Sequence, residues 1–142
     1  MLQKNCQLKQ KFVYLKIKKK MISIGTELIV IDNSGAKKVI CLKILGGSYK
    51  RYGFVGNLLV VSVKNVNPLK KIKKGEIYKA VISGIKKKRV RSNGSLVSFN
   101  LNGAVILNNK QLPIATRLLG PVMAELRNYN FGKILSMATI AI

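Results

Sequence analysis

The strongest constraint on this fold is a series of short apolar runs that are separated by turn-forming residues. The runs occupy residues 22–31, 39–45, 58–66, 77–85, 96–99 and 104–107. Gly, Asn and Pro close them, and the turn at 92–95 contains an Asn93-Gly94 pair that is typical of a β-hairpin. Five or six short strands at regular spacing, without helical periodicity between them, predict a mainly β fold built on a small antiparallel barrel.

The last thirty residues change to a helix-like pattern. Pro121 fits the first position of a helix, where its missing N–H has no cost, and Val122 and Leu126 then fall on one face. A second set of apolar residues has the i, i+3, i+4, i+7 spacing of a short helix: Phe131, Ile134, Leu135 and Ala138. The pattern therefore predicts a small helical C-terminal appendage on an all-β body.

Residues 1–20 contain seven Lys and no Asp or Glu. We interpret them as a basic N-terminal extension of a single domain over residues 21–142. The segment lacks the Arg and Ser that are abundant in imported presequences, and its pattern leaves open an edge strand or a basic helix. The longest apolar stretches of the chain are far shorter than a membrane span.

The charge balance predicts a polyanionic partner, either nucleic acid or an anionic membrane. The chain has 27 Lys and Arg against 4 Asp and Glu, a formal net charge of +23. It has no His, so neither a Ser-His-Asp triad nor a His-metal site is available. Its four carboxylates are widely spaced, and no local pattern pairs two of them for hydrolysis. Cys6 and Cys41 are predicted to be free thiols. We therefore expect no enzymatic activity, no cofactor and no metal site.

Most cations fall in predicted loops, where RNA phosphates would neutralise them. One such cluster is usually a solvated surface, but several clusters with almost no acids favour RNA binding. The predicted RNA-binding residues are Lys37, Lys38, Ser48, Tyr49, Lys50, Arg51, Lys70, Lys71, Lys73, Lys74, Lys86, Lys87, Lys88, Arg89, Arg91 and Arg127. Tyr49 and Tyr52 could stack on bases or pack their loop onto the barrel. Glu125 is predicted to form a local ion pair with an arginine.

Several separated motifs resemble the universal large-subunit ribosomal protein family number fourteen. They are Asp32-Asn33-Ser34-Gly35-Ala36-Lys37-Lys38, Leu45-Gly46-Gly47-Ser48, Arg51-Tyr52, the spacing Asn93-Gly94, Phe99, Asn102 and Val105-Ile106, and Thr116-Arg117-Leu118-Leu119-Gly120-Pro121-Val122 followed by Glu125-Leu126-Arg127. The resemblance runs from about Met21 to the last residue. The chain departs from the family pattern at Asn100, where members usually carry Asp, and at residues 139–141, which replace the usual Pro-Glu.

The resemblance implies a five-stranded antiparallel barrel with a protruding β-ribbon and two short C-terminal α-helices. It also implies a structural constituent of the large ribosomal subunit that binds the rRNA of that subunit and contacts neighbouring large-subunit proteins. Family members contribute to the intersubunit face and to bridges with small-subunit rRNA, and they dock a ribosome-silencing factor. By motif match, Thr116, Arg117 and Lys133 fall on that surface.

The origin of the chain is also suggested by its residue usage. It has 22 Lys against 5 Arg, with abundant Ile and Asn, which indicates an AT-rich gene. A divergent, extended, Lys-rich family member is expected in a mitochondrial ribosome, with a plastid or a bacterial cytoplasm as the alternative. Two other functions remain open: an RNA-binding barrel outside the ribosome, and a membrane-surface binder that uses residues 1–20 as an amphipathic helix.

Overall fold

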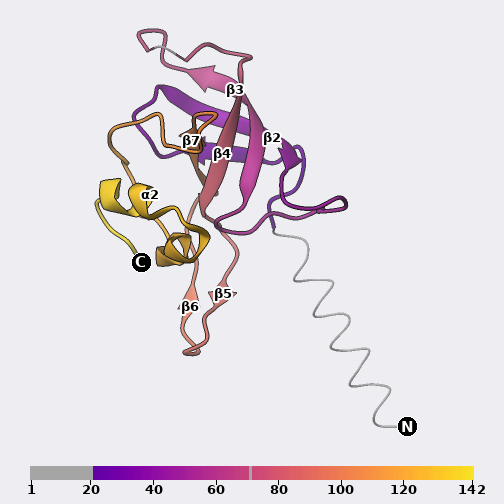
Figure 1. The fold of residues 1–142 in the computed structure, drawn as a ribbon, viewed down its shortest axis with the longest axis vertical. Coiled ribbons are helices and arrows are strands. Elements are labelled where there is room, and N and C mark those ends of the chain that lie inside the picture. Colours follow the sequence, from indigo (N-terminus) through magenta and orange to yellow (C-terminus); the bar gives the residue numbers. More distant parts are fainter. Residues whose placement is uncertain (1–20, 71) are drawn as a thin grey trace.

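The computed structural model describes residues 21–70 and 72–142. The predicted N-terminal extension, including Cys6, and the predicted RNA contact Lys71 lie outside the described residues. Five strands form a closed barrel in the order β1-β2-β3-β4-β7. Their bounds are β1 Glu27–Val30, β2 Ala36–Ile44, β3 Leu58–Val66, β4 Ile77–Gly84 and β7 Gly103–Leu107. The prediction of a five-stranded barrel is thus confirmed (Figure 1).

One pairing in the barrel is parallel rather than antiparallel. Strands β1 and β7 run in the same direction, with Ile29 opposite Gly103, whereas the four other pairings are antiparallel. An odd number of strands that alternate in direction cannot close without one parallel pair. The sequence did not reveal this, because no run of residues specifies which strands meet at the seam.

The barrel core comes from alternating apolar side chains. In β3, Leu59, Val61 and Val63 are fully buried while the residues between them are partly exposed, as expected for a strand with one face inside a barrel. Strand β7 is buried along its whole length. Its outer face is covered by the segment that follows it, where the Ile114 N–H donates to the Ile106 carbonyl at 3.2 Å. This explains why β7 is a continuous apolar run.

Two of the predicted strands differ from the observed ones. The run at 22–31 is interrupted at Gly25, which has φ +84°, so that β1 begins only at Glu27. The run at 96–99 does not join the barrel. It contributes β6 Leu96–Val97, which pairs with β5 Arg89–Val90 in a separate two-stranded ribbon (residues 86–99). Figure 1 shows that the ribbon projects away from the barrel.

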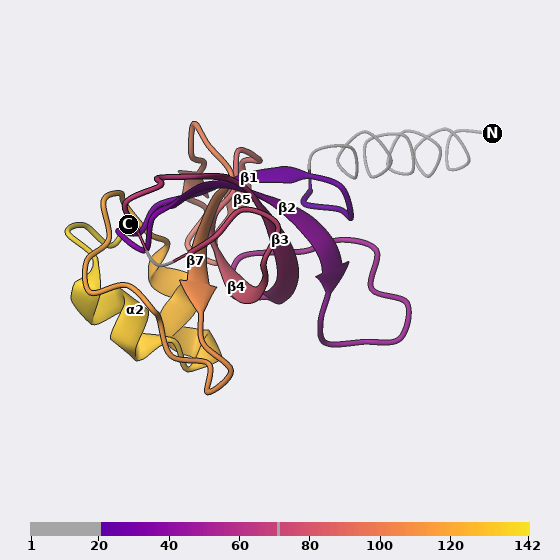
Figure 2. The same ribbon diagram turned by 90° about the horizontal axis from the view of Figure 1, so that it is seen from above.

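The C-terminal segment contains two short helices, as predicted, but the first differs in type and start. It is a 3-10 helix, η1 Ala124–Tyr129, and it does not begin at Pro121. Val122 is instead extended, because its N–H donates to the Ile140 carbonyl at 3.1 Å and its carbonyl accepts from the Ile142 N–H at 2.9 Å. The second helix is α2 Gly132–Met137, and its buried Ile134 joins the barrel core. Figure 2 shows both helices on one side of the barrel.

A buried carboxylate ties the turn after β1 to β7. Asp32 accepts hydrogen bonds from the backbone N–H groups of Ser34 at 2.8 Å and Ile106 at 2.9 Å, and from the Ser34 hydroxyl. Burial raises the pKa of the Asp32 carboxyl above its usual value, while the hydrogen bonds from Ser34 and Ile106 act in the opposite direction. Asp32 is thus a structural acid, with its carboxylate engaged by backbone and hydroxyl donors.

Candidate nucleic-acid interface

The ribbon carries the densest group of cations in the described chain. Its tip is the predicted turn: the Gly94 N–H donates to the Arg91 carbonyl at 3.0 Å, and the Asn93 side chain accepts from the Ser95 N–H at 3.0 Å. Gly94 has φ +79°, a conformation that a β-carbon disfavours. At the other end of the ribbon, Lys86 and Lys88 are exposed.

Beside the tip turn, Arg91 is bound within the protein. Its Nε donates to Glu125 Oε1 at 2.8 Å and its Nη2 to Glu125 Oε2 at 3.1 Å, in a two-pronged ion pair. Nη2 also donates to the Ile142 carbonyl at 2.7 Å. The bond to Arg91 holds the pKa of the Glu125 carboxyl below its usual value. The predicted ion pair of Glu125 is confirmed, and Arg91 retains fewer donors for RNA than the sequence suggested.

The loop between β2 and β3 presents a different combination of side chains. Tyr49 is 92% exposed, Ser48 and Arg51 are exposed, and Tyr52 is half-buried. Gly46, at φ +100°, allows the chain to turn out of β2 into this loop. Figures 1 and 2 agree that the loop extends from the barrel on the side away from α2. The exposed ring of Tyr49 does not pack onto the barrel, and its stacking on a base stays a prediction.

Two further groups of predicted cations are exposed on the barrel. Lys37 and Lys38 lie on β2, and Lys70, Lys73 and Lys74 lie in the β3–β4 loop. Figure 1 shows this loop at one end of the longest axis and the ribbon at the other end. The structure does not bring all the basic clusters together. The basic surface is therefore extended.

Thr116, Arg117 and Lys133 are all exposed, the first two in the segment between β7 and η1 and the last in α2. Asn33, which belongs to the motif at residues 32–38, holds the first of them in place. The Asn33 amide donates to the Thr116 hydroxyl at 3.1 Å, and its side-chain oxygen accepts from the Thr116 N–H at 3.2 Å. The 83 positions between Asn33 and Thr116 explain why no local pattern predicted this contact.

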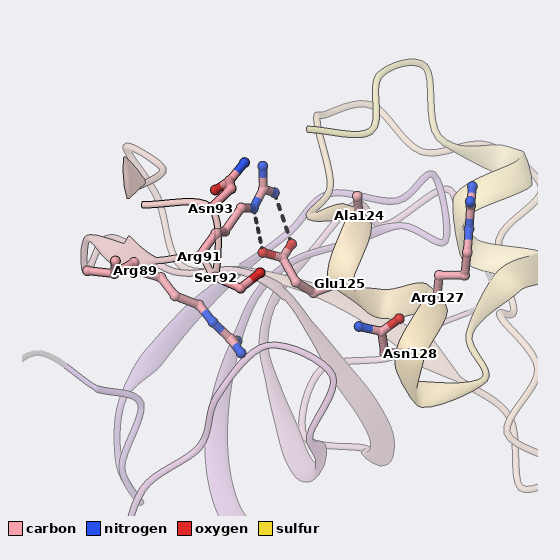
Figure 3. Close-up of a pocket in the computed structure, with 9 residues that line it drawn as sticks. Arg89, Arg91, Ser92, Asn93, Ala124, Glu125, Arg127 and Asn128 are labelled. Carbon is pink, nitrogen blue, oxygen red and sulfur yellow. Dashed lines mark hydrogen bonds and ion pairs between the residues drawn. The ribbon is translucent and has the colours of Figure 1, made fainter. Parts of the chain in front are cut away.

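The structure also forms a cleft that the sequence did not predict. It lies between the ribbon and η1, and we call it the ribbon–helix cleft (Figure 3). Its lining residues are Arg89, Val90, Arg91, Ser92, Asn93, Ala124, Glu125, Arg127 and Asn128. Two segments 34 positions apart meet here through the Arg91–Glu125 pair. Arg127, predicted from the sequence, lines the cleft, whereas Asn128 had no distinguishing signal.

The chain matches the model of one known protein family. The model of the family described as Ribosomal protein L14p/L23e matches residues 21–142. The chain belongs to this family. Membership makes it a structural protein of the large ribosomal subunit, located in the ribosome, in a family that is structural rather than enzymatic. Among the described residues, no helix is both long and apolar enough to span a membrane.

Proposed function

We propose that this protein assembles into the large subunit by binding rRNA through its projecting loops and ribbon. The observation that carries the proposal is that most acidic side chains are bound within the protein. Three of the four carboxylates are engaged within the protein: Asp32 in the core, Glu76 with the Lys73 N–H and the Tyr78 hydroxyl, and Glu125 with Arg91. The exposed lysines and arginines therefore have few acidic side chains to neutralise their charge. A phosphate backbone supplies the missing negative charge.

The two kinds of projection contribute different interactions. Lysines of the ribbon and of the β3–β4 loop neutralise phosphates and release counterions, which gives affinity without sequence selectivity. Tyr49, exposed beside Lys50 and Arg51, offers a flat ring on which an unpaired base can stack. Ser48 adds a hydroxyl donor at the same loop. This division fits an extended basic surface better than a single binding pocket.

Thr116, Arg117 and Lys133 are proposed as the surface that faces the small subunit. Their exposure and the fixed position of Thr116 support a contact with small-subunit rRNA or with a ribosome-silencing factor. Neighbouring large-subunit proteins are further proposed partners. The Lys-rich composition supports a mitochondrial ribosome as the location, with plastid or bacterial ribosomes as the alternatives.

Sedimentation of a native extract on a density gradient, with and without ribonuclease, tests the proposal. Mass spectrometry follows the protein through the fractions, and a fractionated organelle preparation provides the test of location. We expect the protein in the large-subunit fraction, and its release after ribonuclease treatment. Recovery only in light fractions would overturn the proposal and favour an RNA-binding barrel outside the ribosome. Recovery with membranes would favour the surface binder, whose candidate helix lies outside the described part of the chain.

A further inference from the structure

We propose that the ribbon–helix cleft is a built site for one phosphate group of the rRNA backbone, gripped by Arg89 and Asn128. The inference rests on the proposed function and names a particular contact within it. It differs from the general charge argument, because it assigns one guanidinium, whose Nη1 atom is buried, and one amide to a single anion.

The first observation is an unsatisfied donor. The Nη1 atom of Arg89 is buried, and no group within residues 21–70 and 72–142 accepts a hydrogen bond from it. A buried charged donor without an acceptor is costly, and such groups in native proteins normally have a partner. Because Nη1 is closed to solvent, an acceptor in the cleft that Arg89 lines would reach it only after a small turn of the side chain.

The second observation is the direction of the side chains. Figure 3 shows Arg89 extending from β5 into the space between the ribbon and η1, while the Asn128 amide points from η1 toward the ribbon. The side chain of Arg127 runs away from this space in the same view. An oxygen-rich anion between Arg89 and Asn128 would therefore receive donors from both walls of the cleft.

The third observation concerns the one acid in the cleft. Glu125 would repel an anion if it were free, but both of its oxygens already accept from Arg91. The lowered pKa of the Glu125 carboxyl keeps this pair ionised near neutral pH. The pair thus fixes the two walls relative to each other and leaves Arg89 as the cation available to a ligand.

The surroundings favour a phosphate of a polyanion over an isolated carboxylate. The exposed Lys86 and Lys88 lie on the same ribbon as Arg89, so a backbone that places one phosphate in the cleft meets further cations along the ribbon. A lone carboxylate would use the cleft but leave these lysines uncompensated. Arg also suits the site, because its planar fork can hold two phosphate oxygens.

The test measures binding of the full chain to RNA extracted from large subunits, by filter binding over a range of salt concentrations. Arg89→Gln is compared with Lys88→Gln, which removes the same charge from the neighbouring exposed residue. We expect Arg89→Gln to weaken binding at least about tenfold, as for a charge-assisted hydrogen bond, and Lys88→Gln at most about threefold. Arg89→Lys, which keeps the charge but loses the fork, should lie between them.

A second pair of variants leaves Arg89 intact, in case its replacement impairs folding. Asn128→Asp places a carboxylate in the cleft, whereas Asn109→Asp adds the same charge on a turn that does not line it. We expect Asn128→Asp to weaken RNA binding severalfold more than Asn109→Asp, because its carboxylate competes for Arg89. Thermal unfolding of each variant confirms that the fold is retained.

The outcomes separate this inference from the proposed function. If the wild type binds large-subunit RNA and each variant equals its matched control, the cleft assignment is overturned and the function stands. If the wild type does not bind this RNA, both are overturned. If Arg89→Gln matches Lys88→Gln in RNA binding but releases a neighbouring protein from assembled subunits, the cleft holds a protein carboxylate, and the phosphate assignment is wrong.

Discussion

The barrel and the ribbon are both antiparallel in their local pairing, yet different interactions stabilise them. Barrel strands have neighbours on both sides, and residues such as Leu59 and Ile106 are fully buried between them. The ribbon pairs only Arg89–Val90 with Leu96–Val97, and Leu96 is 62% exposed. Its attachment to the body includes the Arg91–Glu125 ion pair.

This difference indicates that stability and binding are carried by separate parts of the molecule. Burial of apolar side chains stabilises the barrel, which needs few charges. A two-stranded ribbon is marginally stable alone, and mutual repulsion of its charges destabilises it further. Contacts with the barrel and η1 are therefore needed to hold the ribbon in place. Substitutions in the two regions should therefore change different measured quantities.

The largest effect should follow loss of a buried barrel side chain. Ile106→Ala leaves a cavity in a fully enclosed strand and should lower the free energy of unfolding by about 2–5 kcal/mol. Leu96→Ala, on the exposed ribbon, should change it by no more than about 0.5 kcal/mol. Denaturant unfolding of both variants measures the difference. Equal losses would mean that the ribbon is part of the cooperative core.

Asp32→Ala should have the next largest effect. It removes the buried acceptor of the Ile106 N–H and should destabilise the protein by about 1–3 kcal/mol. The matched control is Glu27→Ala, which removes an exposed acid from β1 and should be nearly neutral. A stability loss for Glu27→Ala as large as that for Asp32→Ala would contradict a structural role for the buried carboxylate.

Glu125→Gln tests the joint between the two regions. The pKa of the Glu125 carboxyl is lowered from 4.5 in the folded protein, so its stabilisation is present above pH 4.5 and is lost as the pH falls through the lowered value. The variant should be about 1 kcal/mol less stable than the wild type at neutral pH. The two proteins should converge in acid, as measured by thermal unfolding. A constant difference at every pH would exclude the ion pair as the cause.

Tyr49→Ala should leave the free energy of unfolding within about 0.5 kcal/mol of the wild type, because its ring is 92% exposed. Its RNA affinity should nevertheless fall by about 1–3 kcal/mol if a base stacks on the ring. Tyr49→Phe keeps the ring and is expected to bind like the wild type. Normal RNA binding by Tyr49→Ala would remove the stacking contact from the account.

The parts of the fold that the sequence predicted correctly are those with a local cause. Apolar runs between turn residues gave the barrel strands, and Asn93-Gly94 gave the ribbon turn. The extended chain at Val122 was missed, because its hydrogen bonds go to Ile140 and Ile142, far along the sequence. Pro121 favours a helix start locally, and these distant bonds outweigh that preference.

The candidate site was likewise predicted only in part. Cation positions are visible in the sequence, and so is the scarcity of acids that makes RNA a reasonable partner. The exposure of Tyr49 and the position of Arg89 and Asn128 along one cleft depend on how loops and η1 lie on the barrel. No spacing rule could have supplied them, since they follow from contacts between segments that are distant in the chain.

Ultraviolet cross-linking of purified large subunits, followed by mass spectrometry of the protein's peptides, tests the central claim most directly. We expect RNA adducts on the β2–β3 loop around Tyr49 and on the ribbon around Arg89. Unmodified peptides from both regions, in a preparation whose other ribosomal proteins carry RNA adducts, would contradict it.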